Sequence, residues 1–200
     1  MCAHFIMIPK EELEQLIAVI QGNLAARTPV DVAALYPHAY PRAEVPVIQM
    51  HFGQLEINPM TWGYPVAWQK DVLFNTKMET ALGMQKNMWS ESIQHRRCIV
   101  PSLGFFEPHR KDTHASAKTG KPIKDQYLFQ FPDSGVVWMA AIFEESNFSI
   151  MTTAPNPWVK NIHPRMPVVL RRDELGTWLH GDFASLAERN SVALDSRKVA

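Results

Sequence analysis

Cysteine, glycine and net charge are all scarce in this sequence. Its 200 residues include two cysteines and nine glycines, and its 20 basic side chains balance its 20 acidic ones. Two cysteines are too few for a disulfide-stabilised secreted fold. A formal net charge of zero does not indicate a nucleic-acid-binding protein, so any such function must depend on a local basic patch.

Signals for membranes, metals and phosphates are also missing. The N-terminus lacks the basic start and apolar run of a signal peptide, and no stretch approaches the length of a membrane span. There is no glycine-rich phosphate loop and no paired-cysteine zinc motif, and the eight histidines form no H-x-H or H-E-x-x-H pattern. We therefore expect a cytoplasmic protein with no membrane contact, no cofactor and no metal.

What the sequence does contain is material for a core and many turns. It is 46% hydrophobic, with six Trp, ten Phe and 15 Pro. Such a composition favours short strands over long helices. We predict one α+β domain over residues 1–200, strand-rich, with a closed or nearly closed barrel-like sheet and a few packed helices.

Individual elements follow from local patterns. Helical spacing of apolar residues predicts a helix within 9–26, and a second, shorter helix within 171–181 ends at Gly181. Strands are expected within 45–64, 72–80, 97–108 and 148–156, and a hairpin within 126–143 around the turn residues "PDSG". Residues 109–125 are predicted to be a mobile polar loop, and residues 190–200 a loosely held tail.

Charge is distributed unevenly along the chain. Residues 91–125 hold seven basic and four acidic side chains, and residues 157–172 hold four basic side chains and no acidic one. A solvated charged face and a groove that follows phosphates both remain open as explanations.

Cys2 lies directly after Met1, where a structural cysteine gains little because chain ends pack poorly. Removal of Met1 would leave an α-amine, with a pKa of about 7.7–8.0, beside a thiol with a pKa of about 8.5. Both groups would be partly nucleophilic near neutrality. A residue of no chemical importance is the alternative. Cys98, between Arg97 and Ile99, is expected to be a buried structural thiol.

Three further polar residues follow apolar runs: Asn75 after "VLF", Glu107 after "LGFF", and His163 within "NIHPRMPVVL". Each has a structural interpretation, respectively a turn cap, a surface carboxylate and a histidine bonded to a carbonyl. Partial desolvation behind two phenylalanines would raise the pKa of Glu107 and suit it to acid–base catalysis.

Six motifs occur in order, and each corresponds to a known family motif: "MCAHF", "YPRAEVPVI", "WGYPVAW", "NTKMET", "RRCIVPSLGFFEP" and "TTAPNPWVKNIHPRMPVVL". In these motifs the sequence resembles the SRAP family, the SOS response-associated peptidase-like proteins that process abasic sites in DNA. The resemblance extends from Cys2 to about Leu179.

The resemblance implies an activity in the DNA damage response. The freed amine of Cys2 would attack the aldehyde of an abasic deoxyribose, and its thiol would close a thiazolidine, giving a covalent crosslink to single-stranded DNA. Asn75 would orient the amine or the sugar, Glu107 would move protons, and His163 would hydrogen-bond the sugar oxygen and assist reversal. The same residues, or a host aminopeptidase, would remove Met1. The protein would act as a monomer in the bacterial cytosol or nucleoid.

The resemblance also implies DNA contacts at five positions, Pro41, Trp68, Lys77, Thr153 and Arg165. Core packing is the alternative for Trp68, and a solvated surface position is the alternative for Lys77. The sequence departs from the family pattern at His4 and Lys77, where arginines are usual, at Ala3 for Gly, and at His38 for Asn. These changes predict weaker phosphate binding, because arginine offers a permanent charge and a bidentate geometry.

Two other functions fit the same residues. One is a cysteine peptidase acting on protein, with Cys2 as nucleophile, His163 as base and Asn75 as orienting group. The other is a non-catalytic relative that binds single-stranded DNA without reacting with it.

Overall fold

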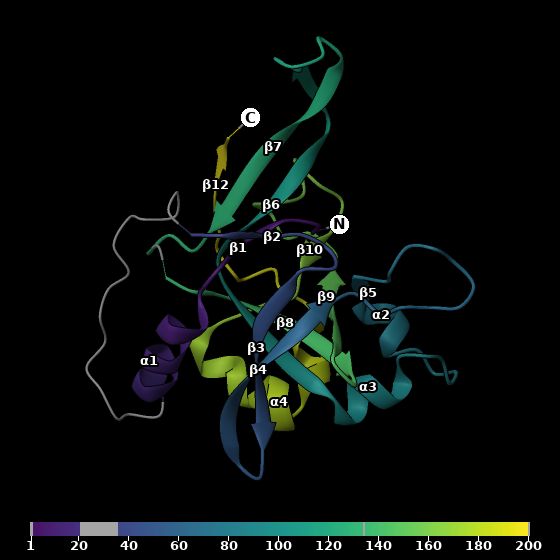
Figure 1. Ribbon diagram of the computed structural model, residues 1–200, viewed down its shortest axis with the longest axis vertical. Coiled ribbons are helices and arrows are strands. Elements are labelled where there is room, and N and C mark those ends of the chain that lie inside the picture. Colours follow the sequence, from purple (N-terminus) through teal and green to yellow (C-terminus); the bar gives the residue numbers. More distant parts are fainter. Residues whose placement is uncertain (1, 21–35, 134, 200) are drawn as a thin grey trace.

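The computed structural model describes residues 2–20, 36–133 and 135–199 (Figure 1). Its helices are α1 (Lys10–Ile20), α2 (Met78–Ala81), α3 (Ser90–His95) and α4 (Leu175–His180), with 3₁₀ turns at Arg172–Glu174 and Phe183–Ala187. Its strands are β1 (Phe5–Met7), β2 (His38–Ala39), β3 (Glu44–His51), β4 (Gln54–Trp62), β5 (Asn75–Lys77), β6 (Arg97–Ala115), β7 (Pro122–Gln130), β8 (Val137–Glu144), β9 (Asn147–Thr153), β10 (Met166–Pro167), β11 (Val169–Leu170) and β12 (Asp195–Lys198).

Five of these strands close into a ring. β8 pairs with β9, β9 with β4, β4 with β3, β3 with β6, and β6 returns to β8. The expected strand-rich α+β fold with a closed or nearly closed sheet is therefore confirmed. β4 and β9 run parallel, while the other pairs of the ring are antiparallel.

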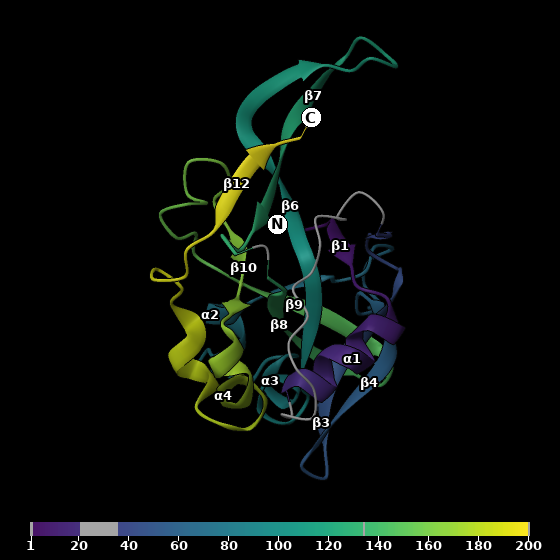
Figure 2. The same cartoon turned by 90° about the vertical axis from the view of Figure 1, so that its left-hand side faces the viewer.

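Side-chain alternation on the ring strands separates two cores. On β6, Cys98 and Val100 belong to a cluster that takes residues from all five ring strands and fills the inside of the ring. Ile99, between them, belongs to a second cluster, on the outside. Helices α1, α3 and α4 cover that outer cluster in the lower half of the molecule (Figures 1 and 2). β6 is consequently buried on both faces from Cys98 to Glu107.

The helix predicted within 9–26 begins one residue after Pro9, and α1 extends to Ile20. Residues 21–26 of that prediction lie outside the described residues. The helix predicted within 171–181 is present as a 3₁₀ turn followed by α4, which ends at His180, immediately before Gly181.

The hairpin predicted within 126–143 is wrong. β7 pairs with β6 residues 105–115, and β8 pairs with β6 residues 97–102. Both are antiparallel to β6, so they run in the same direction and cannot pair as a hairpin. The 19-residue β6 is long enough to hold the two strands end to end.

Gly104 marks the change of partner along β6. Its φ is +156°, and a Cβ there would lie 2.8 Å from the Phe129 carbonyl oxygen. Only glycine accommodates this approach without strain. The Gly104 amide donates to the Ser102 hydroxyl at 3.0 Å, which fixes the bend.

Residues 109–125, predicted to be a loop, are mostly strand. β6 continues to Ala115 and β7 starts at Pro122, so only 116–121 form the turn. The resulting ribbon extends beyond the ring at the top of Figure 1. Both faces of its outer half are exposed to water, so its side chains are polar. A hydrophobicity pattern therefore predicts a loop there rather than a strand.

Residues 190–199 of the tail predicted to be loose are also ordered by pairing, and residue 200 lies outside the described residues. β12 lies antiparallel to β7, with Ser196 opposite Phe129. Val192 and Leu194 are buried, and the Asn156 side-chain amide donates to the Val192 carbonyl oxygen at 2.7 Å. The partner residues of these contacts are far from residues 190–200 in the sequence, so the local composition of the tail did not reveal the contacts.

Candidate active site

The N-terminal segment reaches the site because β1 pairs with β6. Phe5 lies opposite Phe105, and the Phe106 amide donates to the His4 carbonyl oxygen at 2.9 Å. This pairing places Cys2 in the core beside the buried end of β6, with its side chain fully buried. The chain therefore holds its first residues by ordinary sheet hydrogen bonds.

Asn75 fixes the backbone of Cys2. It lies at the start of β5, which runs parallel to β9, and its Nδ2 donates to the Cys2 carbonyl oxygen at 2.7 Å. The other side-chain atom, Oδ1, is buried and accepts no hydrogen bond from the described residues. A buried acceptor in this state is suited to a ligand N–H or O–H, because leaving it unpaired is costly.

Glu107 and His163 form a pair next to Cys2. His163 Nδ1 lies 3.4 Å from Glu107 Oε2, and the Glu107 side chain is fully buried. Burial raises the pKa of Glu107 to about 7. Near neutral pH the carboxyl group is therefore divided between its acid and base forms, as acid–base catalysis requires.

The histidine is held in a defined orientation. Its Nδ1 lies 2.8 Å from the Arg165 carbonyl oxygen and 3.3 Å from the Arg165 amide nitrogen. The carbonyl oxygen can only accept and its contact is the shorter one, so we assign the proton to Nδ1 and the lone pair to Nε2. Burial lowers the pKa of His163, which keeps the imidazole neutral near pH 7.

The Cys2 thiol is also perturbed. Burial, followed by the negative charge of Glu107, raises its pKa well above the usual range. The thiol is therefore mostly protonated at neutral pH and needs a base when it reacts. The Phe106 amide, one residue before Glu107, donates to the His4 carbonyl oxygen, so the pairing of the N-terminal segment with β6 brings Cys2 to the Glu107 end of β6. The structure thus brings together all four predicted catalytic residues, Cys2, Asn75, Glu107 and His163.

The five predicted DNA contacts fall into two groups. Trp68 is 67% exposed, so it is not a core residue, and Lys77 is exposed two residues after Asn75 on β5. Pro41 is half-buried in the turn before β3. These three side chains are accessible to a ligand.

Arg165 and Thr153 are engaged within the protein. The Arg165 guanidinium binds Glu79 through two contacts of 2.6 and 3.0 Å and donates to the Thr152 carbonyl oxygen at 2.8 Å. Thr153 is buried, and its hydroxyl donates to the Ala187 carbonyl oxygen at 2.6 Å. In this structure Thr153 holds the C-terminal segment against β9 rather than facing a DNA ligand.

Comparison with known proteins identifies the family. The family model for the SOS response associated peptidase (SRAP) matches residues 1–199. The chain belongs to the SRAP family. Its relatives include the abasic site processing protein YedK of Escherichia coli, which is 26% identical over 196 residues, or 92% of this chain and 82% of YedK.

A second relative is the abasic site processing protein YoaM of Bacillus subtilis, 30% identical over 128 residues. The match covers 62% of this chain and only 56% of YoaM. Solved SRAP-like folds include a protein of Bordetella bronchiseptica, with a TM-score of 0.71 and 18% identity over the whole of both chains. A protein of Bacteroides thetaiotaomicron has a TM-score of 0.69 and 24% identity, covering all of this chain and 92% of that one.

An aromatic cluster beside this SRAP site was not foreseen from the sequence. The His4 ring stacks on Tyr40 at 4.4 Å and on Phe106 at 3.9 Å between centroids. His4 Nε2 lies 2.6 Å from His38 Nδ1. The two substitutions at His4 and His38 therefore meet as a contacting pair. The antiparallel pairing of β1 with β2 brings these two residues together, so a correct prediction of that pairing would have predicted the contact.

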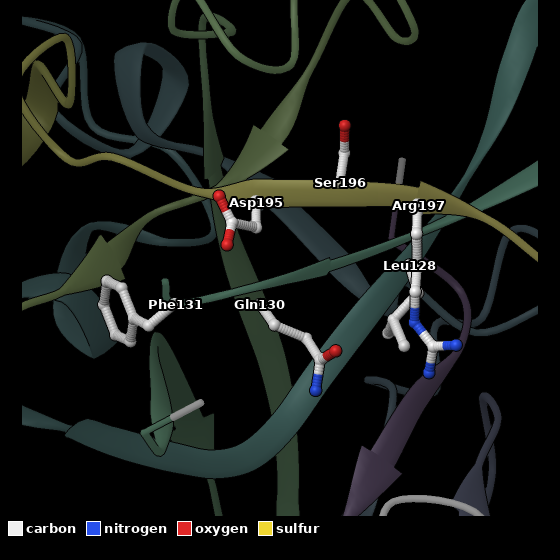
Figure 3. Close-up of a pocket in the computed structure, with 6 residues that line it drawn as sticks. All are labelled: Leu128, Gln130, Phe131, Asp195, Ser196 and Arg197. Atoms are coloured by element: carbon white, nitrogen blue, oxygen red, sulfur yellow. The ribbon is translucent and has the colours of Figure 1, made fainter. Parts of the chain in front are cut away.

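A groove lies along the β7–β12 pair (Figure 3). Its lining residues are Leu128, Gln130, Phe131, Asp195, Ser196 and Arg197. Leu128 follows Tyr127, the partner of Glu107 on β7, so its side chain points to the opposite face. The groove is therefore separate from the catalytic residues of this SRAP fold.

No helix among the described residues is both long and apolar enough to cross a membrane. Within the same residues, no group of three or more His, Cys, Asp and Glu side chains is arranged to hold a metal ion.

Proposed function

We propose that this protein captures abasic sites in single-stranded DNA as a covalent thiazolidine crosslink at Cys2, after removal of Met1. The observation that supports it most directly is the convergence of Cys2, Asn75, Glu107 and His163 from four separate segments of the chain. The family and the abasic-site-processing names of the relatives agree with this chemistry.

The first step joins the Cys2 amine to the open-chain aldehyde of the abasic sugar. The nitrogen lone pair forms a bond to the aldehyde carbon, and one N–H proton passes to the oxygen. The resulting hydroxyl takes a second proton and leaves as water, so that a protonated imine remains. Glu107, with a pKa of about 7, can donate the proton that this water needs.

The second step closes the ring. The Cys2 sulfur adds to the carbon of the protonated imine, the C=N electron pair moves to nitrogen, which keeps its proton, and the thiol proton passes to a base. Because the pKa of the thiol is raised, a neighbouring base must accept its proton, and the Glu107 carboxylate is such a base. A five-membered ring with C–S and C–N bonds resists the hydrolysis that removes a simple imine.

Asn75 and His163 position these reactants. The bond from Asn75 to the Cys2 carbonyl holds the nucleophile in place, and the unpaired Oδ1 can accept a hydrogen bond from the amine or from a sugar hydroxyl. His163, oriented through Nδ1, directs the Nε2 lone pair away from Arg165 and can accept a hydrogen bond from the sugar.

The DNA strand would contact Pro41, Trp68, Lys77 and Arg165. An exposed tryptophan offers a stacking surface for a base, and a lysine beside Asn75 offers a charge for a phosphate. Arg165 would exchange one of its Glu79 contacts for a phosphate oxygen. Cleavage of the Met1–Cys2 peptide bond by the same residues is part of this proposal.

The experiment uses purified protein and a single-stranded oligonucleotide with one abasic residue. A denaturing gel should show a shifted band. Its intact mass should equal the protein without Met1, plus the DNA, minus one water. Cys2→Ala and Cys2→Ser both keep the α-amine and lack sulfur, so each should give at most an imine that hydrolyses and no stable band.

A variant with one alanine inserted before Cys2 separates the competing functions, because it blocks the amine and retains the thiol. Loss of the crosslink in this variant supports the proposal. Peptide cleavage by the same variant would support a cysteine peptidase. Salt-sensitive DNA binding by the wild type without any covalent product would support a non-catalytic module.

A further inference from the structure

The β6–β7 ribbon that continues beyond Glu107 is strongly basic. We call residues 108–126, the outer parts of β6 and β7 and their turn, the arm. It contains five lysine or arginine side chains: Arg110, Lys111, Lys118, Lys121 and Lys124. All five are exposed.

The acids of the arm do not neutralise these cations. Asp125 is occupied by His114 and Lys198, each at 2.7 Å, and Asp112 lies 3.4 Å from His109. Within residues 2–20, 36–133 and 135–199, none of the five cations forms an ion pair. Lys124 donates to the Arg110 carbonyl oxygen and retains its charge.

The position of the arm relates it to the proposed active site. Glu107 is the residue directly before the arm on β6, and the Arg110 amide donates to the Ile162 carbonyl oxygen at 2.8 Å, next to His163. From Glu107 to Ala115 a strand extends at most about 27 Å at about 3.4 Å per residue. That length spans at most about eight nucleotides, because the phosphates of an extended single strand are at least as far apart as the about 3.4 Å rise of a stacked strand. Figures 1 and 2 show the arm projecting away from the ring.

We infer that the arm is a second DNA-binding surface, which contacts the phosphates on one side of the residue held at Cys2. This inference rests on the proposed function for its ligand. The arm offers little apolar surface besides Ile123, which is 44% exposed, so it fits a polyanion better than an apolar protein face. Contacts from lysine and arginine to phosphates position a strand without reading its sequence.

The test measures non-covalent binding of intact single-stranded oligonucleotides, which contain no aldehyde and cannot crosslink. Wild-type protein should bind more tightly as the flank on one side of the central nucleotide grows to about eight nucleotides, at about 3.4 Å each. The variant Lys111→Ala/Lys118→Ala/Lys121→Ala should lose this dependence on flank length. The Lys→Arg variant at the same positions should retain it.

Salt dependence gives a quantitative readout. Each phosphate contact contributes about 0.7 to the slope of log affinity against log salt for single strands. Loss of three contacts lowers the slope by about 2, so between 50 and 200 mM salt the wild type should lose about 16-fold more affinity than the triple variant. Lys10→Ala/Lys86→Ala removes exposed cations outside the arm and should leave the flank dependence intact.

An unchanged slope and flank dependence in the triple variant would overturn the inference. So would an equal loss in the Lys10/Lys86 control. Arm-dependent binding to anionic vesicles with DNA binding unaffected would assign the arm to a membrane surface instead. Crosslinking of a short abasic oligonucleotide is measured in parallel. If the wild type fails to crosslink but the arm effects appear, the proposed function is overturned and the arm surface stands.

Discussion

At the scale of single residues, burial governs the chemistry. Cys2 and Glu107 are both fully buried, and the pKa of each is raised, which favours the neutral form of each group. A neutral thiol beside a carboxyl group that titrates near pH 7 is a poor resting nucleophile but a well-placed pair for proton transfer. This arrangement favours a reaction in which the thiol acts second, after the amine.

Replacement of Glu107 by Gln should change how stability depends on pH. The pKa of Glu107 is about 7 in the folded protein and about 4.3 when unfolded, so the folded state binds the proton more tightly. The free energy of unfolding of the wild type should therefore fall as pH rises from about 5 to about 8, by about 3 kcal/mol from this group. Glu107→Gln should remove that fall.

Urea unfolding at several pH values measures it. Glu11→Gln, an exposed change on α1, is the matched control and should keep the wild-type slope. Equal slopes for Glu107→Gln and the wild type would contradict the raised pKa.

His4 should be uncharged during DNA binding. Burial, followed by repulsion from His38, lowers the pKa of His4 to about 4. His4→Arg would add a permanent positive charge and can still stack on Phe106. We expect tighter binding of single-stranded DNA and a salt slope steeper by about 0.7. Fluorescence anisotropy at several salt concentrations measures both, and His4→Gln, which adds no charge, should match the wild type.

At the scale of elements, one carboxylate links β6, β7 and β12 by side-chain contacts. Asp125 on β7 binds Lys198 of β12 and His114 of β6, each at 2.7 Å, and these contacts hold its pKa below the usual range. A lowered pKa means that this stabilisation is present above the unfolded pKa and is lost as pH falls through the folded one.

Asp125→Asn should therefore accelerate amide hydrogen exchange in residues 195–198 near neutral pH, whereas the wild type should lose these contacts only when the pH falls below the ordinary aspartate pKa of about 3.9. Asp195→Asn, on the same strand and exposed, serves as the control. No increase in exchange in β12 for Asp125→Asn would show that backbone pairing alone holds the strand.

At the scale of the whole molecule, the ring depends on its filled interior. Phe148 is fully buried and stacks on Trp62, with ring centroids 6.3 Å apart. Phe148→Ala should lower the free energy of unfolding by about 3–5 kcal/mol, because it leaves a cavity in a closed sheet. Phe52→Ala, at a site 94% exposed, should change it by less than about 0.5 kcal/mol. Denaturant unfolding of both variants makes the comparison, and similar losses would contradict the assignment of Phe148 to the core.

Much of this architecture could be predicted from local patterns, and the failures share one cause. The amphipathic start of α1, the stop at Gly181 and the buried run of β6 are encoded within a few residues. The pairing of β7 with β6 rather than β8, and of β12 with β7, depends on contacts between distant segments. The outer half of β6 is polar because water covers it, so no apolar alternation marks it as a strand.

The candidate site could also be predicted only in part from the sequence. The sequence motifs identified Cys2, Asn75, Glu107 and His163, and desolvation behind Phe105 and Phe106 correctly indicated a raised Glu107 pKa. The sequence did not reveal that Asn75 binds the Cys2 carbonyl, that His4 contacts His38, or that Thr153 faces Ala187. Each of these contacts joins residues at least 34 positions apart, which only the fold brings together.

The enclosure of both cysteines has a consequence for conditions that damage DNA by oxidation. Peroxide attacks the thiolate of an accessible cysteine, and the resulting sulfenic acid has lost its nucleophilic sulfur. Cys2 is fully buried in this structure and largely in its thiol form, so peroxide should oxidise it more slowly than an exposed cysteine.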